Sequence, residues 1–301
     1  MLNKKRILLL ITMAAILIAT PILAMCATDD GREEERTRVL TLWQVDSFEG
    51  GRGSRTQYLQ DVAETFFDGT KTYVTVTSLS ADAARENIAA GNVPDMISYG
   101  AGFYGIETLI NPADFTYICW CRGAYLLICL DDACDFSDVT PQNTVINEGR
   151  DNLVSACALF EGLSGATFEA PTSAYVSLIN GRYKYLLGTQ RDICRLETRE
   201  QSYKAKVVTS FNDLYQNISI LNNNDDYSYC RDFCLYLNDV SQGVASLGMV
   251  SDGAQSVGVR AEMQSAEYEY AITSFVGETY INEVKKAINN SDLNSLKNLL
   301  K

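Results

Sequence analysis

The sequence predicts an α/β fold in which a largely parallel sheet is covered by helices. Short apolar runs with β-branched residues alternate along the chain with segments whose apolar residues recur at helical spacing. The composition is that of a globular protein, with 47% hydrophobic and 21% charged residues. The chain of 301 residues is long for one hydrophobic core and sufficient for two lobes of ordinary size.

The first elements form a βαβαβ unit. Residues 39–45 are a short apolar strand, and residues 55–67 place their apolar side chains on one helix face. Residues 73–79 alternate β-branched and polar side chains as a strand does, and residues 81–90 return to a short helix. A turn signal at Pro94 opens a third strand over residues 94–99.

The remaining elements indicate a crossing into a second lobe and a return. Residues 117–130 are too long and too apolar for a simple edge strand, and we expect them to be a strand or strand pair that crosses between the lobes. The segments that follow are expected to be helical at 152–160, 174–179 and 191–198 and extended at 183–187, while 207–221 carries the chain back. Helices at 229–237 and from residue 265 onward are expected to close the first lobe.

The N-terminus has the layout of a secretory signal, because basic residues 4–6 precede an uncharged, mostly apolar run. Residues 23–26, Leu-Ala-Met-Cys, resemble a bacterial lipobox, which implies cleavage after a signal peptide of residues 1–25 and lipidation of Cys26. Met25 is larger than the small residue usual at that place, so ordinary cleavage and an uncleaved anchor remain alternatives. Residues 26–38, rich in charge, are expected to be a flexible tether on the outer face of the bacterial cytoplasmic membrane.

Charge and composition exclude several classes of function. The formal net charge of −13 disfavours nucleic acid and anionic lipid as partners, while a neutral or cationic ligand fits better. The chain has no histidine, which removes the commonest general base, the Ser-His and Cys-His nucleophile pairs and the usual zinc sites. We therefore expect no catalytic residue, no cofactor and no metal.

Nine cysteines include eight beyond Cys26. An even number outside the cell permits disulfides, but no C-x-x-C pair occurs and most of these cysteines lie in apolar runs. Buried thiols are the favoured interpretation, with one or two disulfides as the alternative.

In a parallel sheet the ligand site lies beyond the carboxyl ends of the strands, so the loops at 44–54 and 100–105 are the first places to look. Trp43 can stack on a sugar ring or pack in the core, and Trp120 can face the cleft from the crossing strand or, as is favoured, pack in the core; Trp43, Glu49 and Trp120 are expected to approach a common cleft. The proposed ligand-binding set is Trp43, Asp46, Glu49, Tyr99, Tyr104, Trp120 and Arg122. Further candidates, each with a structural alternative, are Arg52, Arg55, Phe103, Tyr125, Gln190 and Arg191.

The segment LWQVDSFEGGRGSR at 42–55 looks like the first strand and loop of extracellular solute-binding proteins of ABC-type sugar importers. GNVPDMI at 91–97 is similar to the family's entry to its third strand, and 169–175 with 183–192 resembles segments of shorter clostridial-type lipoprotein members. The resemblance implies a two-lobed periplasmic-binding-protein-like fold of type II with hinge strands. It assigns 39–117 and 209–301 to the first lobe and 118–208 to the second.

The resemblance also implies a function. The expected protein captures a small polar solute, above all a saccharide, in a cleft between the lobes and delivers it to the subunits of an ABC permease. The alternative is a degenerate member that has lost import and acts as a sensor or interaction lipoprotein. Either function involves binding without catalysis.

Overall fold

The computed structural model describes residues 37–46, 55–110, 118–131, 134–149, 152–221, 226–241, 261–263 and 265–301, with only the backbone of Asp46. The predicted signal peptide, most of the tether, Cys26, Glu49 and Arg52 lie outside the described residues. Residues Val39–Lys301 make up one compact unit. None of the helices among the described residues is long and apolar enough to cross a membrane.

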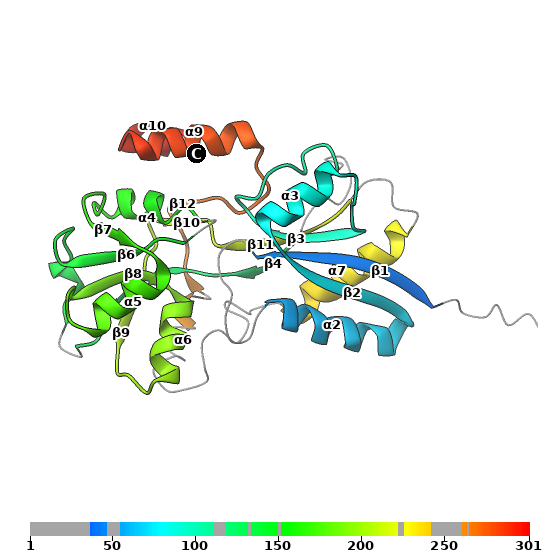
Figure 1. The fold of residues 1–301 in the computed structure, drawn as a ribbon, viewed down its shortest axis with the longest axis horizontal. Helices are drawn as coiled ribbons and strands as arrows, with labels where there is room; N and C mark the ends of the chain where they lie inside the picture. Colours follow the sequence, from blue (N-terminus) through cyan, green and yellow to red (C-terminus); the bar gives the residue numbers. More distant parts are fainter. Residues whose placement is uncertain are drawn as a thin grey trace, which may run out of the picture. The chain divides into compact units, whose positions relative to one another are not determined.

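The first sheet has the strand order β2-β1-β3-β11-β4 (Figure 1). Strands β1 and β3 are parallel, whereas β11 runs antiparallel to both of its neighbours, β3 and β4. The strands are β1 Arg38–Asp46, β2 Thr72–Ser80, β3 Met96–Gly100, β4 Ile118–Arg122 and β11 Tyr215–Ile220. The helices of this part are α2 Arg55–Thr70, α3 Ala81–Ala89 and α7 Tyr227–Ser241.

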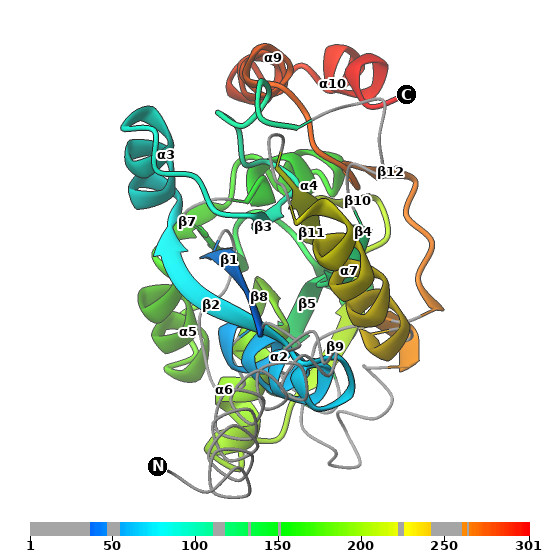
Figure 2. The same cartoon turned by 90° about the vertical axis from the view of Figure 1, so that its right-hand side faces the viewer.

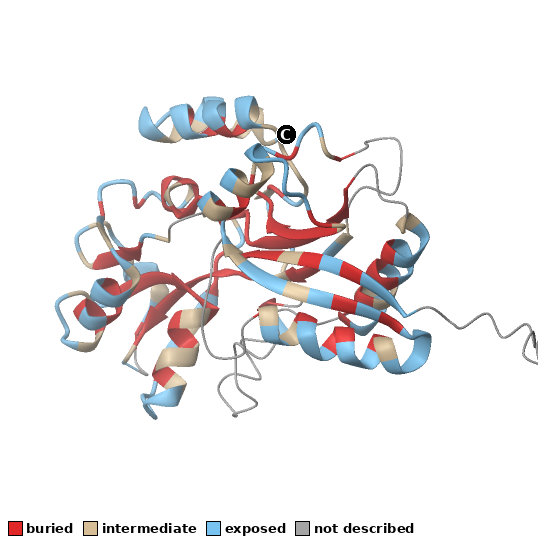
Figure 3. Ribbon diagram, turned by 45° about the vertical axis from the view of Figure 1, so that its right-hand side comes forward, coloured by how far each residue is buried: buried red, intermediate tan, exposed pale blue. Residues whose placement is uncertain are grey.

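The two faces of the first sheet bury different clusters, because successive side chains of a strand point to opposite faces. Leu40 and Leu42 of β1 pack with apolar residues of α2 and α7. Val45 instead packs with Ala81 and Ala84 of α3. Strands β3 and β11 are buried throughout, the edge strand β2 is exposed over much of its length, and the helices bury one side only (Figure 3).

The second sheet has the strand order β7-β6-β8-β5-β9. Strand β6 is parallel to both β7 and β8, and β5 is antiparallel to both β8 and β9. The strands are β5 Tyr125–Cys129, β6 Thr144–Asn147, β7 Thr167–Glu169, β8 Tyr185–Thr189 and β9 Lys204–Val207. The helices of this part are α4 Val154–Phe160, α5 Pro171–Ile179 and α6 Gln190–Thr198, with a short 3-10 turn at Phe136–Asp138.

The two sheets share one arrangement. Each has three strands in the order second, first, third, followed by an antiparallel strand and an edge strand. The antiparallel strand is in each case the one that the chain enters after crossing from the other sheet, β5 in the second and β11 in the first. The sequence-based expectation of a strand pair over 117–130 is confirmed, since β4 ends at Arg122 and β5 begins at Tyr125.

The C-terminal helices differ from expectation. Strand β12 (Tyr270–Ala271) pairs with β10 (Phe211–Asn212), and α9 (Glu278–Asn289) lies beside α10 (Leu293–Leu299), as Figures 1 and 2 both show. Residues 265–301 were assigned to the first lobe. Val284 and Ala287 of α9 and Leu296 of α10 instead belong to the cluster of α4 and the second sheet, because α9 packs on α4.

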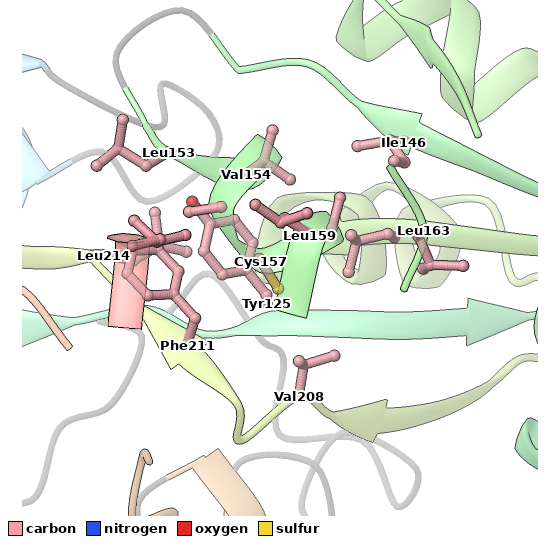
Figure 4. Packing of buried hydrophobic residues seen from close by; sticks show 14 of the residues in the cluster. Tyr125, Ile146, Leu153, Val154, Cys157, Leu159, Leu163, Val208, Phe211 and Leu214 are labelled. Carbon is pink, nitrogen blue, oxygen red and sulfur yellow. The ribbon is translucent and has the colours of Figure 1, made fainter. Parts of the chain in front are cut away.

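That cluster is the largest in the described part of the chain (Figure 4). Tyr125 of β5, Cys157 of α4 and Phe211 of β10 pack together in it. It therefore joins the second sheet to the segments through which the chain passes between the sheets.

The described cysteines include both buried thiols and one disulfide, the two alternatives that the sequence left open. Cys129 and Cys134 form a disulfide. Cys119, Cys121, Cys157, Cys194, Cys230 and Cys234 remain thiols, and four of these six are buried. Burial raises the pKa of the Cys157 and Cys234 thiols, so these groups stay protonated and pack as small apolar side chains.

Candidate functional site

Buried polar side chains collect at the carboxyl ends of β1 and β3 in the first sheet. Gln44 and Ser98 are paired across these strands, and Gln216 of the antiparallel strand β11 lies next to them. Gln216 Nε2 donates to Ser98 Oγ at 3.1 Å and to the Val45 carbonyl oxygen at 3.3 Å. All three polar side chains are fully buried, so this part of the sheet interior carries a set of neutral hydrogen-bonding groups.

Trp120 belongs to this polar group through its ring nitrogen. Nε1 donates to Ser98 Oγ at 3.0 Å, the ring stacks on Tyr58 of α2, and the side chain is 2% exposed. Trp43 instead packs, half-buried, with the cluster on the α3 face. Trp120 packs in the cluster of Leu40 and Leu42 and Trp43 in that of Val45, so the two tryptophans lie on opposite faces of the first sheet and do not line one surface.

The aromatic candidates after β3 belong mainly to the core. Tyr99 is fully buried, and its hydroxyl forms one hydrogen bond of 2.8 Å with Ser219 Oγ, in which either oxygen can be the donor. Phe103 is buried beside it, and the half-buried Tyr104 ring lies 4.8 Å from the guanidinium carbon of Arg85. Among these, Tyr104 alone keeps a partly exposed ring.

The charged candidates are dispersed. Arg55 is buried as the first residue of α2, and half-buried Arg122 donates to the Ala266 carbonyl oxygen at 3.5 Å. Arg191 is half-buried near the start of α6. Glu49 and Arg52 lie outside the described residues, as does the side chain of Asp46.

A second polar group occupies the carboxyl ends of β6 and β8. Asn147 is the last residue of β6, and its Nδ2 donates to Asp192 Oδ2 at 2.7 Å. The Thr189 backbone nitrogen, at the end of β8, donates to the same oxygen at 3.1 Å. Asp192 is the third residue of α6, so the group also stands at the N-terminus of that helix.

This second group has a specific fit to the backbone. A Cβ atom at Gly188 would lie 2.3 Å from Asp192 Oδ2, so only glycine lets the carboxylate lie against β8. Asp192 is fully buried, and this burial raises its pKa, although hydrogen bonds from Asn147 and Thr189 act in the opposite direction. Arg195 Nη1 lies 3.6 Å from the other oxygen, Oδ1.

The two crossings between the sheets are hydrogen-bonded to each other. The Gly123 nitrogen donates to the Leu214 carbonyl oxygen at 2.6 Å, and Asn212 Nδ2 donates to the Gly123 carbonyl oxygen at 3.0 Å. Gln190, the first residue of α6, accepts from the Ala124 nitrogen at 3.2 Å and fills the space beside Gly123. The start of α6 is thus connected to the crossing segment.

Sequence reasoning missed most of these groups. Gln44, Ser98, Gln216, Asn147 and Asp192 were not among the predicted site residues, although Gln190 was considered. A usable signal was present, because Ser98 and Asn147 are single polar residues near the end of apolar strands. Among the described residues, no three Cys, Asp or Glu side chains are grouped so as to hold a metal ion.

Comparison with solved structures identifies the fold. A substrate-binding domain assigned to a molybdenum ABC transporter from Clostridium difficile matches 77% of this chain and 99% of its own length, with 11% identity and a TM-score of 0.51. Iron-bound HitA from Pseudomonas aeruginosa matches with 11% identity over 85% of this chain and 100% of its own, at a TM-score of 0.53. The Atu4243-GABA receptor matches with 12% identity over 84% and 96%, at a TM-score of 0.52.

The chain has the fold of type II periplasmic-binding proteins. The expected fold class is thereby confirmed. No family model and no curated protein matches the sequence. The names of these structures refer to molybdenum, iron and GABA, and none refers to a saccharide.

Proposed function

We propose that this protein is an extracytoplasmic solute-binding protein that captures a small polar solute and delivers it to an ABC permease. The observation that carries the proposal is the repeated strand order of the two sheets, joined by crossings that are hydrogen-bonded to each other at Gly123. Two α/β lobes on such a hinge favour a closed state when a solute contacts both, because only closure makes both sets of contacts.

The buried polar groups support the class of solute. Neutral amides and hydroxyls gather at the carboxyl ends of the strands: Gln44, Ser98 and Gln216 are fully buried and hydrogen-bonded within the first lobe, and Asn147 of the second lobe is 6% exposed. Such groups recognise a polar solute by hydrogen bonds, and the acidic chain disfavours a strongly anionic one. The solute that we propose in particular is a saccharide, which would be held by hydrogen bonds more than by stacking on Trp120.

A thermal-shift screen with sugars, oligosaccharides, amino acids and peptides tests the proposal. A solute present at about 100 times its dissociation constant adds about 2.7 kcal/mol to the free energy of unfolding. A clear rise in melting temperature with one chemical class supports solute capture. No rise with any class favours instead the alternative of a sensor or interaction lipoprotein, for which a protein partner would then be sought.

We propose further that Cys26 carries a lipid that holds the protein at the outer face of the membrane. Expression in a Gram-positive host with labelled palmitate should label the wild type and leave Cys26→Ala unlabelled. An unlabelled wild-type chain with an intact Met1 would indicate an uncleaved anchor instead.

A further inference from the structure

The polar group at the carboxyl ends of β6 and β8 contains acceptor atoms that receive no hydrogen bond from any of the described residues. Asn147 Oδ1 and Asp192 Oδ1 are both buried and accept no hydrogen bond. Asn147 is 6% exposed and Asp192 is fully buried. An unsatisfied buried acceptor lowers the stability of the folded state by about 1–3 kcal/mol. A group with two such acceptors is therefore a candidate binding site.

The orientation of the Asn147 amide is fixed by its neighbour. Asp192 Oδ2 receives the Thr189 N–H at 3.1 Å and faces the Asn147 side chain at 2.7 Å. A carboxylate oxygen can only accept, so the Asn147 nitrogen faces it and Oδ1 is turned away. Reversing the amide would place two acceptors against each other.

The second acceptor is charged but incompletely satisfied. Asp192 Oδ1 lies 3.6 Å from Arg195 Nη1, which is close enough for an ion pair and too far for a hydrogen bond. Arg195 Nη1 donates instead to the Pro171 carbonyl oxygen at 3.1 Å. The absence of a side chain at Gly188 leaves the space that the Asp192 carboxylate occupies, so the local sequence is specific for this arrangement.

We infer that this group is the second-lobe half of the solute site and that it takes a solute group that donates hydrogen bonds, a hydroxyl or an ammonium. The inference rests on the proposed function and adds the chemistry of the bound group. Two buried acceptors require donors, and a fully deprotonated oxyanion has none to offer. The site therefore selects sugars, polyols or amines over sulfate or molybdate.

The test is a thermal-shift and calorimetric comparison of six probes on the full chain: glucose, maltotriose, γ-aminobutyric acid, spermidine, sulfate and molybdate. At least one of the first four should bind, and Asn147→Leu should weaken it at least 10-fold. Asp192→Asn distinguishes a bound ammonium from a bound hydroxyl, because it should weaken the binding of an ammonium probe at least 10-fold and that of a hydroxyl probe less.

Folding and site effects are separated by a matched control. Asn143→Leu alters another amide of the same lobe, which hydrogen-bonds to the Thr140 nitrogen and the Asp138 carbonyl oxygen before β6, and it should leave probe binding unchanged. Should Asn147→Leu unfold the protein, Asn147→Asp provides the second variant, since it removes the donor to Asp192 and places two carboxyl groups together.

Three outcomes contradict the inference. Tight binding of sulfate or molybdate alone, or donor-probe binding that survives both Asn147 and Asp192 substitutions, overturns it while solute capture stands. No binding of any probe overturns the inference together with the proposed function.

Discussion

Asp213 is a buried carboxyl group in the segment that returns from the second sheet to the first. Its Oδ1 accepts the Tyr125 hydroxyl at 2.6 Å, and Oδ2 accepts the Leu153 nitrogen at 2.7 Å. Burial raises its pKa from 3.8 to about 6, although both hydrogen bonds act in the opposite direction. The carboxyl thus ties β5 and the start of α4 to the crossing.

The raised pKa predicts a pH dependence of stability. Between about pH 4 and 6 the folded state holds a proton that the unfolded state has released, so this group's contribution is greatest below pH 4 and is lost as pH rises through 6. The loss is about 3 kcal/mol at most. Melting curves from pH 4.5 to 7.5 should show that Asp213→Asn gains stability relative to the wild type as pH rises. A constant difference would mean that Asp213 does not titrate in this range.

The disulfide predicts a count of thiols. In denaturant, maleimide should label two more cysteines after reduction than before it, because Cys129 and Cys134 are joined while the other described cysteines remain thiols. Mass spectrometry of the labelled chain gives the count. A difference of zero contradicts the disulfide, and a difference of four or more would mean that further cysteines pair.

At the scale of elements, the crossing segment and the start of α6 depend on each other. A Cβ at Gly123 would lie 2.5 Å from Gln190 Nε2, and Gln190 is fully buried, so its amide has little room to move. Gly123→Ala should therefore displace the amide that caps the Ala124 nitrogen and cost about 1–3 kcal/mol of stability.

A double-mutant cycle measures this dependence. Adding Gln190→Ala to Gly123→Ala should recover part of the loss, with a coupling of about 0.5–3 kcal/mol in denaturant titrations. Gly165→Ala is the control, because a Cβ there meets Pro141 at an ordinary 3.7 Å. Strictly additive effects of the two substitutions would show that Gly123 and Gln190 act independently.

The type of many elements could be predicted from the sequence, but the short strands β6 and β7 were not predicted, and neither were the packing partners of the elements. The period-2 and helical patterns correctly indicated β2 and α2, since each pattern reflects one buried face, and the long apolar run at 117–130 correctly indicated the β4–β5 pair, in which β5 is buried throughout. The apolar face of α9 is equally clear, but periodicity does not say which lobe covers it. The same limit explains why the shared surface of Trp43 and Trp120 was wrongly expected, because that required knowing the face on which each strand residue lies.

The sequence predicted where in the fold polar groups would gather, but not which residues would form them. The carboxyl ends of the strands follow from the parallel sheet, and the structure does place polar groups there. The individual residues depend on pairings such as that of Asn147 with Asp192, which are 45 positions apart. Tyr99 was a candidate because of its place at the end of the third strand and Trp120 because of its place in the crossing strand, yet both are buried in the core.

At the scale of the whole molecule, the two sheets are expected to act together on one solute. Gln44 and Ser98 lie near the carboxyl ends of β1 and β3 in the first sheet. Asn147 and Asp192 lie at the carboxyl ends of β6 and β8 in the second sheet. Solute contact with both groups would favour closure about the crossings at Gly123 and Leu214.

Hydrogen exchange followed by mass spectrometry tests whether one solute contacts both sheets, with the full chain in detergent and the probe that gives the largest rise in melting temperature. We predict added protection in peptides from both sheets at once, covering residues 98–105 at the end of β3 and beyond it and residues 188–193 at the end of β8 and the start of α6, with little change in α10. Protection confined to one sheet, or none at either place, would contradict a solute site shared by the two lobes.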